Sequence, residues 1–202
     1  MRYTEFQNLM ASFAVFSLND ARMIEPDFDR RRLHEWQTRG YIKLITKGYY
    51  IFADIDIDDA RLDCIANRIY APSYVSLETA LSRAGLLPDT VRQVTSVSTR
   101  KTHTLTTKIA TFSYRTIAPR LFFGYAIQDR GTRVASVEKA VLDYLYLHPD
   151  LRTQQDFESL RVDRPELSAR VDQKRLEAFL DRFGGKALKE RTAKFMKWVR
   201  YD

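Results

Sequence analysis

The sequence has few of the residues that build disulfide frameworks or metal sites. It contains one cysteine, Cys64, which excludes an internal disulfide and a cysteine-based metal cluster. Its three histidines, His34, His103 and His148, are too scattered along the chain to suggest a site. We therefore expect no metal ion and no cofactor.

Long apolar runs and catalytic signatures are also missing. No stretch of about 18 apolar residues occurs, so we expect no membrane span. The N-terminal sequence MRYTEFQNLM lacks the apolar core of a signal peptide, and we expect a cytoplasmic protein. There is no Gly-rich phosphate loop, no His-Glu-x-x-His and no Gly-x-Ser-x-Gly. The chain is therefore not expected to be an enzyme.

What the chain does have is a globular composition and an excess of basic residues. Of its 202 residues, 45% are hydrophobic, which is enough to bury a core in one or two domains. Lysine and arginine number 33 against 26 acidic residues, which gives a formal net charge of +7. This charge is compatible with a polyanionic partner.

Region 16–53 has the order of elements that a winged helix-turn-helix requires. Ser17 is a good N-cap for a short helix, which Glu25-Pro26-Asp27 then interrupts, because the residue before a proline avoids the helical region. Asp27 is expected to cap a second, basic helix over Phe28–Arg39, and Gly40 to end it.

Two strands, 41–45 and 49–52, are expected after this helix, with a hairpin turn at 46–48. A basic helix followed by a ribbon suits double-stranded DNA, with the helix in the major groove and the ribbon against phosphates or the minor groove. The expected DNA contacts are Arg30, Arg31, Arg32, His34, Thr38, Arg39, Lys43 and Lys47. The alternative is that the arginine run is only the solvated face of an ordinary helix.

Apolar residues at helical spacing predict a first helix over 2–15, which would complete a three-helix core. The acidic stretch 54–59 is interpreted as a domain boundary. A calcium loop is disfavoured there, because the required glycine and distal glutamate are missing. We therefore expect a DNA-binding domain over 1–56 and a second domain over 57–202.

The second domain is expected to mix helices and strands. The pattern predicts helices over 59–71, 77–84 and 137–147, the last two capped by Ser76 and Ser136. Strands are expected in 91–99, 104–109, 111–117 and 122–128. The overall prediction is an α+β fold: a winged helix-turn-helix, then a mixed α/β domain with a helical C-terminal region.

Three polar residues of the second domain are the best candidates for a functional site: Glu78, Lys139 and Asp143. The structural alternatives are that Glu78 complements a helix dipole and that Asp143 forms a salt bridge or cap. The C-terminal region, about 150–202, is helical and basic in pattern. It suits a nucleic acid or an acidic partner, or is simply solvated.

Several stretches resemble the AbiEi family of antitoxins. They are FSLNDARMI and RRRLHEWQTRGYIKLITKGYYIF near the N-terminus, then SYVSLETALSRAGLLP, TFSYRTI, LFFGY and RVASVEKAVLDYLYLHP in the same order. The likeness spans about residues 6 to 150, and Ser-Leu-Glu-x-Ala-Leu and Glu-Lys-Ala-x-Leu-Asp are its most specific parts. The segment Glu-Pro-Asp-Phe departs from the family, where a small residue and serine are expected.

This resemblance implies an antitoxin of a type IV toxin–antitoxin system that represses its own operon through the winged helix. The implied partners are double-stranded operator DNA, with inverted repeats, and a nucleotidyltransferase-like toxin that is opposed without a stable complex. Two alternatives stay open. The chain is a plain transcription factor whose second domain senses a ligand or dimerises, or it is a protein that binds a toxin directly.

Overall fold

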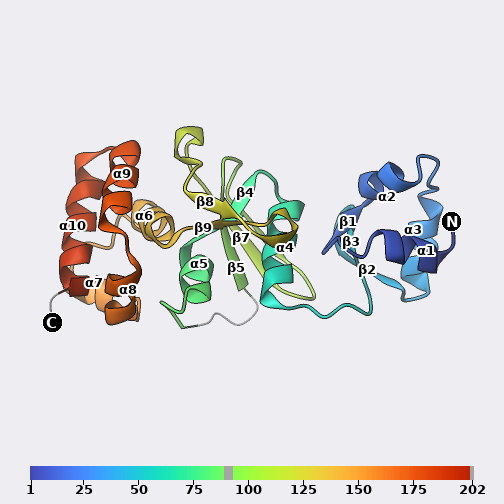
Figure 1. Cartoon of the computed structure of the whole chain (residues 1–202), viewed down its shortest axis with the longest axis horizontal. Helices are drawn as coiled ribbons and strands as arrows, with labels where there is room; N and C mark the ends of the chain where they lie inside the picture. Colours follow the sequence, from blue (N-terminus) through green and yellow to red (C-terminus); the bar gives the residue numbers. More distant parts are fainter. Residues whose placement is uncertain (89–92, 201–202) are drawn as a thin grey trace.

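The computed structural model describes residues 1–88 and 93–200. The chain is an α+β protein, as the sequence predicts at that level. Three parts follow one another along its long axis (Figure 1). They are an N-terminal part with a small sheet, a central part built on a larger sheet, and a set of C-terminal helices.

The N-terminal part, residues 1–52, combines helices with a three-stranded antiparallel sheet of order β1-β3-β2. Its elements are α1 (Tyr3–Leu9), β1 (Phe16–Ser17), α2 (Leu18–Ile24), α3 (Arg31–Thr38), β2 (Ile42–Thr46) and β3 (Tyr49–Phe52). Ser17 caps α2 as expected, since its Oγ accepts from the N–H of Asp20 at 3.3 Å. The predicted hairpin is confirmed, with its turn at Lys47-Gly48.

Two helix boundaries differ from the sequence prediction. The first helix ends at Leu9 rather than near residue 15, because the chain turns to form β1. The helix predicted over Phe28–Arg39 begins at Arg31, because Phe28 is drawn into the core between other rings. The carboxylate that accepts from the Arg31 N–H is that of Asp29, at 2.9 Å, and not that of Asp27.

An aromatic core holds the N-terminal part together. The Phe6 ring centre lies 4.9 Å from that of Trp36 and 5.3 Å from that of Phe28. The buried members of this cluster are Phe6, Met10, Phe16, Ala21, Phe28, Leu33, Trp36, Ile42 and Phe52. Apolar burial of this extent fixes the orientation of α3 relative to the hairpin.

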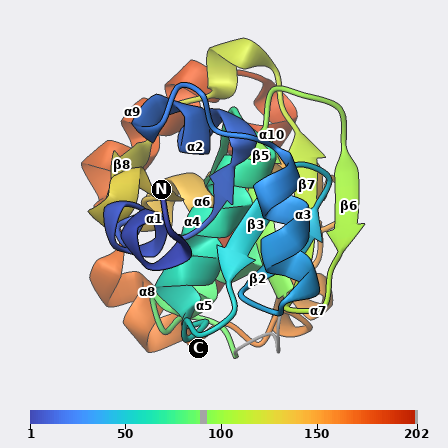
Figure 2. The ribbon, with the colours of Figure 1, turned by 90° about the vertical axis from the view of Figure 1, so that its right-hand side faces the viewer.

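The small sheet contributes to a second core as well. Ala14, Val15, Ile45 and Ile51 belong to the larger hydrophobic cluster of the rest of the chain. The sheet therefore lies between helices α1 to α3 and helix α4 (Figure 1). Figure 2 shows the N-terminal part in front, in a view onto its end of the molecule. The division of the chain at residue 56 stays an expectation.

The central sheet has six strands in the order β6-β7-β5-β4-β9-β8, with parallel and antiparallel pairs. They are β4 (Ser73–Val75), β5 (Gln93–Ser98), β6 (His103–Thr106), β7 (Thr111–Thr116), β8 (Tyr125–Ile127) and β9 (Arg133–Ala135). The strand predicted over 91–99 is seen from Gln93, and residues 91 and 92 lie outside the described residues. The strand predicted over 122–128 is shorter, because Phe123 turns into the core before β8 begins.

Helices cover both faces of this sheet (Figure 1). Helix α4 (Asp59–Ile69) lies on one face, where the Tyr114 hydroxyl donates to the carbonyl of Ala66 at 2.9 Å. Helices α5 (Leu77–Arg83) and α6 (Val137–Leu147) lie on the other. Short 3-10 turns, η1 (Pro119–Leu121) and η2 (Asp129–Gly131), precede and follow β8.

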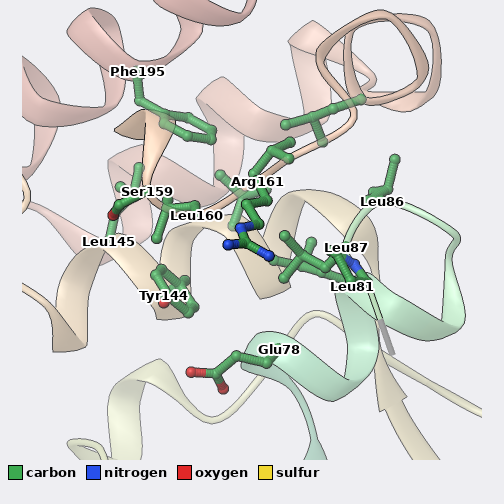
Figure 3. A pocket seen from close by; sticks show the side chains of 14 residues that line it. Glu78, Leu81, Leu86, Leu87, Tyr144, Leu145, Ser159, Leu160, Arg161 and Phe195 are labelled. Carbon is green, nitrogen blue, oxygen red and sulfur yellow. The ribbon is translucent and has the colours of Figure 1, made fainter. Parts of the chain in front are cut away.

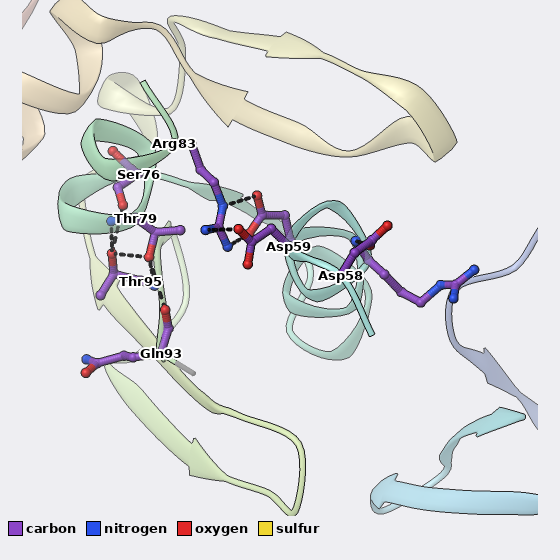
Figure 4. Close-up of polar contacts among 9 residues, drawn as sticks. Asp58, Asp59, Ser76, Thr79, Arg83, Gln93 and Thr95 are labelled. Carbon is purple, nitrogen blue, oxygen red and sulfur yellow. Dashed lines mark hydrogen bonds and ion pairs between the residues drawn. The ribbon is translucent and has the colours of Figure 1, made fainter. Parts of the chain in front are cut away.

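Polar contacts tie α5 to its neighbours (Figure 4). Arg83 pairs with Asp59 of α4 at 2.7 Å. The Thr95 hydroxyl donates to the Ser76 carbonyl at 2.8 Å. Ser76 stands at the N-cap of α5 as predicted, but its hydroxyl makes no cap hydrogen bond, because it donates to Asp143 instead.

The C-terminal helices are α7 (Gln154–Glu158), α8 (Arg164–Arg170), α9 (Gln173–Phe183) and α10 (Lys186–Arg200). Of these, α9 and α10 pack against α6 on the side away from the sheet, and α7 and α8 pack against α10 (Figure 1). The predicted apolar stripe of the last helix is confirmed, with Leu188, Phe195, Met196 and Val199 buried. Its basic residues Lys194 and Lys197 are exposed.

Candidate functional site

The outer face of α3 is the first candidate site. Arg30, at the N-terminal end of the helix, and Arg31, His34 and Thr38 within it are exposed. The Arg31 side chain is 93% exposed, and its guanidinium lies 3.2 Å from the carboxylate of Asp29. The opposite face of α3 is buried in the aromatic core. These four side chains are therefore available to a partner.

Two other arginines predicted to contact DNA are held by carboxylates. Arg32 donates to Glu25 at 2.9 Å, and its guanidinium carbon lies 5.7 Å from the centre of the Phe28 ring. Arg39 pairs with Glu35 at 2.8 Å, and both side chains are more than half exposed. A phosphate has to displace these carboxylates, as it has to displace Asp29 from Arg31. Arg32 and Arg39 are less available than Arg31 because their side chains are less exposed.

The β2-β3 hairpin carries the remaining predicted contacts beside α3. The Lys43 amine donates to the carbonyl of Ala53 at 3.0 Å, at the base of the hairpin. Lys47 is exposed at the turn, where Gly48 has a φ of +84° that glycine adopts without strain. The fold thus brings all eight predicted DNA contacts into one N-terminal unit.

The charge of this unit is a feature that whole-chain composition conceals. Residues 1–56 contain eight basic and eight acidic side chains, so the net charge of +7 arises from residues 57–202. Any attraction of the α3 face for an anionic partner therefore depends on the positions of its own basic side chains. A general positive field cannot supply it, because residues 1–56 carry no net charge.

A fully buried polar cluster joins β4 to α6. The Lys139 amine donates to Oδ1 of Asp143, one helical turn later, and to the Tyr74 hydroxyl at 2.7 Å. Asp143 Oδ2 accepts from the hydroxyls of Tyr74 and Ser76, each at 2.8 Å. The exposed fractions of the Lys139 and Asp143 side chains are both 0%. Two of the three polar candidates are thus partners of each other.

The surroundings of this cluster are apolar. The Lys139 amine lies 4.8 Å from the centre of the Phe183 ring and 5.1 Å from that of Phe123. Burial raises the pKa of the Asp143 carboxyl and lowers the pKa of the Lys139 amine, while their direct hydrogen bond opposes both shifts. Because these groups are buried and paired with one another, the cluster ties α6 to β4 of the sheet.

Glu78, the third candidate, lies apart from this cluster and lines an apolar pocket of about 300 Å³ (Figure 3). Oε2 of Glu78 is buried and makes no hydrogen bond within the described residues. Burial raises the pKa of the nearby Tyr144 to about 12, with the Glu78 carboxylate adding to the shift. The other lining residues include Leu81, Val141, Leu160 and Phe195. Sequence reasoning missed this pocket, because its walls come from distant segments.

Within residues 1–88 and 93–200, no three His, Cys, Asp or Glu side chains gather as metal ligands would. No helix in these ranges is both long and apolar enough to cross a bilayer.

The architecture defines the chain as an α+β protein with a small antiparallel sheet and a larger mixed sheet. No family model and no curated protein matches it. Among solved structures, it is similar to the RV2827C protein from Mycobacterium tuberculosis, with a TM-score of 0.61 and 14% sequence identity. The likeness covers 98% of this chain and 78% of that one, and it shows a shared fold.

Proposed function

We propose that this protein is a DNA-binding autorepressor and the antitoxin of a type IV toxin–antitoxin system. The observation that carries the proposal is the exposed face of α3 beside the β2-β3 hairpin. The order α1-β1-α2-α3-β2-β3, with strands in the order β1-β3-β2, supports a winged helix-turn-helix. The resemblance to AbiEi antitoxins supports the assignment of the second domain.

In this proposal α3 enters the major groove of operator DNA. Arg30, Arg31 and His34 meet base edges, and a well-oriented arginine discriminates a guanine by about 1–3 kcal/mol. Lys43 and Lys47 on the hairpin meet phosphates or the minor groove. The protein binds inverted repeats in its own promoter and blocks transcription there.

Residues 57–202 act separately, by opposing a nucleotidyltransferase-like toxin without forming a stable complex with it. Because Lys139 and Asp143 are fully buried, they serve this role by holding α6 in position. Variants that lose DNA binding should therefore still protect cells that express such a toxin from a neighbouring gene. Loss of protection in these variants would contradict the division of roles.

The test of DNA binding is fluorescence anisotropy with the full chain and the DNA upstream of its own gene, across a salt series. We expect Arg31→Ala/Lys47→Ala to weaken binding by about tenfold or more. The control variant Lys194→Ala/Lys197→Ala removes the same charge from α10 and should bind as the unaltered protein does. Equal, weak binding to promoter and scrambled DNA would refute the proposal.

The apolar pocket favours a second candidate function. A cavity of about 300 Å³ is at the lower end of the sizes that bind small ligands. A plain winged-helix transcription factor that senses a small molecule would use such a cavity. The absence of a toxin gene beside this one would favour that function, and stable co-purification with a toxin would favour direct toxin binding.

A further inference from the structure

A second, polar cavity of about 350 Å³ lies where the N-terminal part meets the central part. Its walls come from three segments: the start of α2 with Tyr49 of β3, helix α4, and the η2 loop up to Arg133. Ligand cavities occur preferentially at such junctions. The proposed DNA contacts and the buried Lys139 cluster lie elsewhere, so neither accounts for this cavity.

The charge of its lining is strongly one-sided. Three arginines, Arg68, Arg130 and Arg133, face one carboxylate, that of Asp20. The Arg68 guanidinium forms an ion pair with the Asp20 carboxylate, with a nitrogen–oxygen distance of 2.6 Å. The guanidinium groups of Arg130 and Arg133 make no hydrogen bond or ion pair within the described residues.

A buried donor adds an independent observation. Asn67 lines the same cavity and is 6% exposed. Its Oδ1 accepts from the backbone N–H of Arg133 at 2.7 Å, which fixes the orientation of the amide. Its Nδ2 is buried and has no hydrogen-bond partner within the described residues. A buried N–H group without a protein acceptor is costly, and an acceptor oxygen of a bound molecule would satisfy it.

The backbone at the cavity rim is held in an uncommon conformation. Arg130 has a φ of +58°, in the left-handed region that non-glycine residues seldom adopt. Such conformations persist where the surrounding structure fixes them, and they cluster at ligand sites.

We propose that this junction cavity binds a small phosphate-bearing molecule of about the size of a nucleoside monophosphate. Two unpaired guanidinium groups can bind phosphate oxygens through paired N–H donors, and Asn67 supplies a further donor. The ligand contacts residues of both the N-terminal and the central part. If the proposed DNA-binding function holds, its occupancy changes the affinity for operator DNA.

The test is isothermal titration calorimetry on the full chain without DNA, at constant ionic strength, with AMP, adenosine and inorganic phosphate. We expect saturable binding of AMP and weaker binding of phosphate, and no binding of adenosine. If phosphate binds and AMP does not, the cavity holds the free ion, and the proposed size of the ligand is wrong. Arg130→Gln/Arg133→Gln should reduce the affinity at least about tenfold.

The matched control is Lys194→Gln/Lys197→Gln, which makes the same change in net charge on the exposed face of α10. It should keep the affinity within about twofold. Circular dichroism and the melting temperature check that both variants are folded. No saturable heat with AMP or phosphate up to about 10 mM, or an equal loss in the control, would overturn the site. Because no DNA is present, this result is independent of the autorepressor test.

Discussion

Helices α3 and α6 both carry charged side chains, and they use them in opposite ways. On α3 the Arg31 side chain is 93% exposed, and it pairs with an exposed aspartate, Asp29. On α6 the Lys139 and Asp143 side chains are entirely buried and bonded to each other. Water screens the first pair, whereas the second loses hydration and depends on its partners. Burial therefore separates charges that can meet a ligand from charges that hold the fold.

The strongest way to test this comparison is to break the buried pair. Asp143→Ala leaves the Lys139 amine buried without its carboxylate and should lower the free energy of unfolding by about 3–5 kcal/mol. Urea unfolding followed by circular dichroism measures this. The double variant Lys139→Met/Asp143→Leu should be less unstable than the single one, because no uncompensated charge remains. A loss below about 1 kcal/mol in Asp143→Ala would contradict the assigned role.

The next largest effect on stability is expected from disturbing the packing around the buried Lys139. Gly124 has a φ of +76°, and a Cβ there would lie 3.0 Å from both the Lys139 side chain and the Phe179 ring. Gly124→Ala should cost about 1–3 kcal/mol, measured by thermal unfolding. Gly48→Ala is the control, because its φ is also positive but, within residues 1–88 and 93–200, no atom beyond its chain neighbours lies within 4 Å of the added Cβ. Equal losses in the two variants would show that contact with Lys139 contributes nothing.

The Asp20–Arg68 pair is intermediate in burial between the ion pairs of α3 and α6. Asp20 is buried, while its partner Arg68 is 44% exposed. Burial would raise the pKa of the Asp20 carboxyl, but hydrogen bonds from Arg68 and Ser17 outweigh it and hold the pKa below its ordinary value. A lowered folded-state pKa stabilises the fold at higher pH, and this contribution is lost as the pH falls through that pKa.

Asp20→Asn should therefore destabilise the protein at pH 7 by about 1 kcal/mol, as expected for a helix N-terminal interaction. The difference from the unaltered protein should shrink as the pH falls below about 3.9, the ordinary pKa of an aspartate. It should disappear only once the pH lies below the lowered pKa of the Asp20 carboxyl in the folded protein. Urea midpoints measured at a series of pH values provide the test. A difference that does not depend on pH would rule out the carboxylate as its source.

The smallest effect is expected on the α3 surface. Arg39 and Glu35 form an exposed i,i+4 pair at 2.8 Å. Arg39→Ala should change the free energy of unfolding by only about 0.3–0.5 kcal/mol. A double-mutant cycle with Glu35→Ala isolates the coupling, and a coupling above about 1 kcal/mol would mean that this surface is structural.

Local patterns in the sequence predicted local structure well. The serine caps at Ser17 and Ser136, the Lys47-Gly48 turn and the apolar stripe of α10 all appear where expected. Each depends on residues within one or two turns of each other, so spacing alone is informative.

The structural features that the sequence did not indicate depend on residues that are distant along the chain. Helix α3 begins later than predicted because Phe28 packs on Phe6. The Ser76 hydroxyl donates to Asp143 and does not cap α5. Strands β4 and β9 have three residues each and show no readable period. The Lys139–Asp143 spacing was visible, but Tyr74, which completes the cluster, lies 65 residues before Lys139.

The ends of the central sheet have a consequence for how the protein behaves at high concentration. An edge strand offers unpaired backbone groups to other chains, and proteins limit this with short strands or with lysines. At one edge β8 has only three residues. At the other, β6 is flanked by the exposed Lys101 and Lys108, whose charges would repel the same lysines of a second molecule. Both edges thus oppose growth of the sheet from one chain into the next, which protects the protein against aggregation.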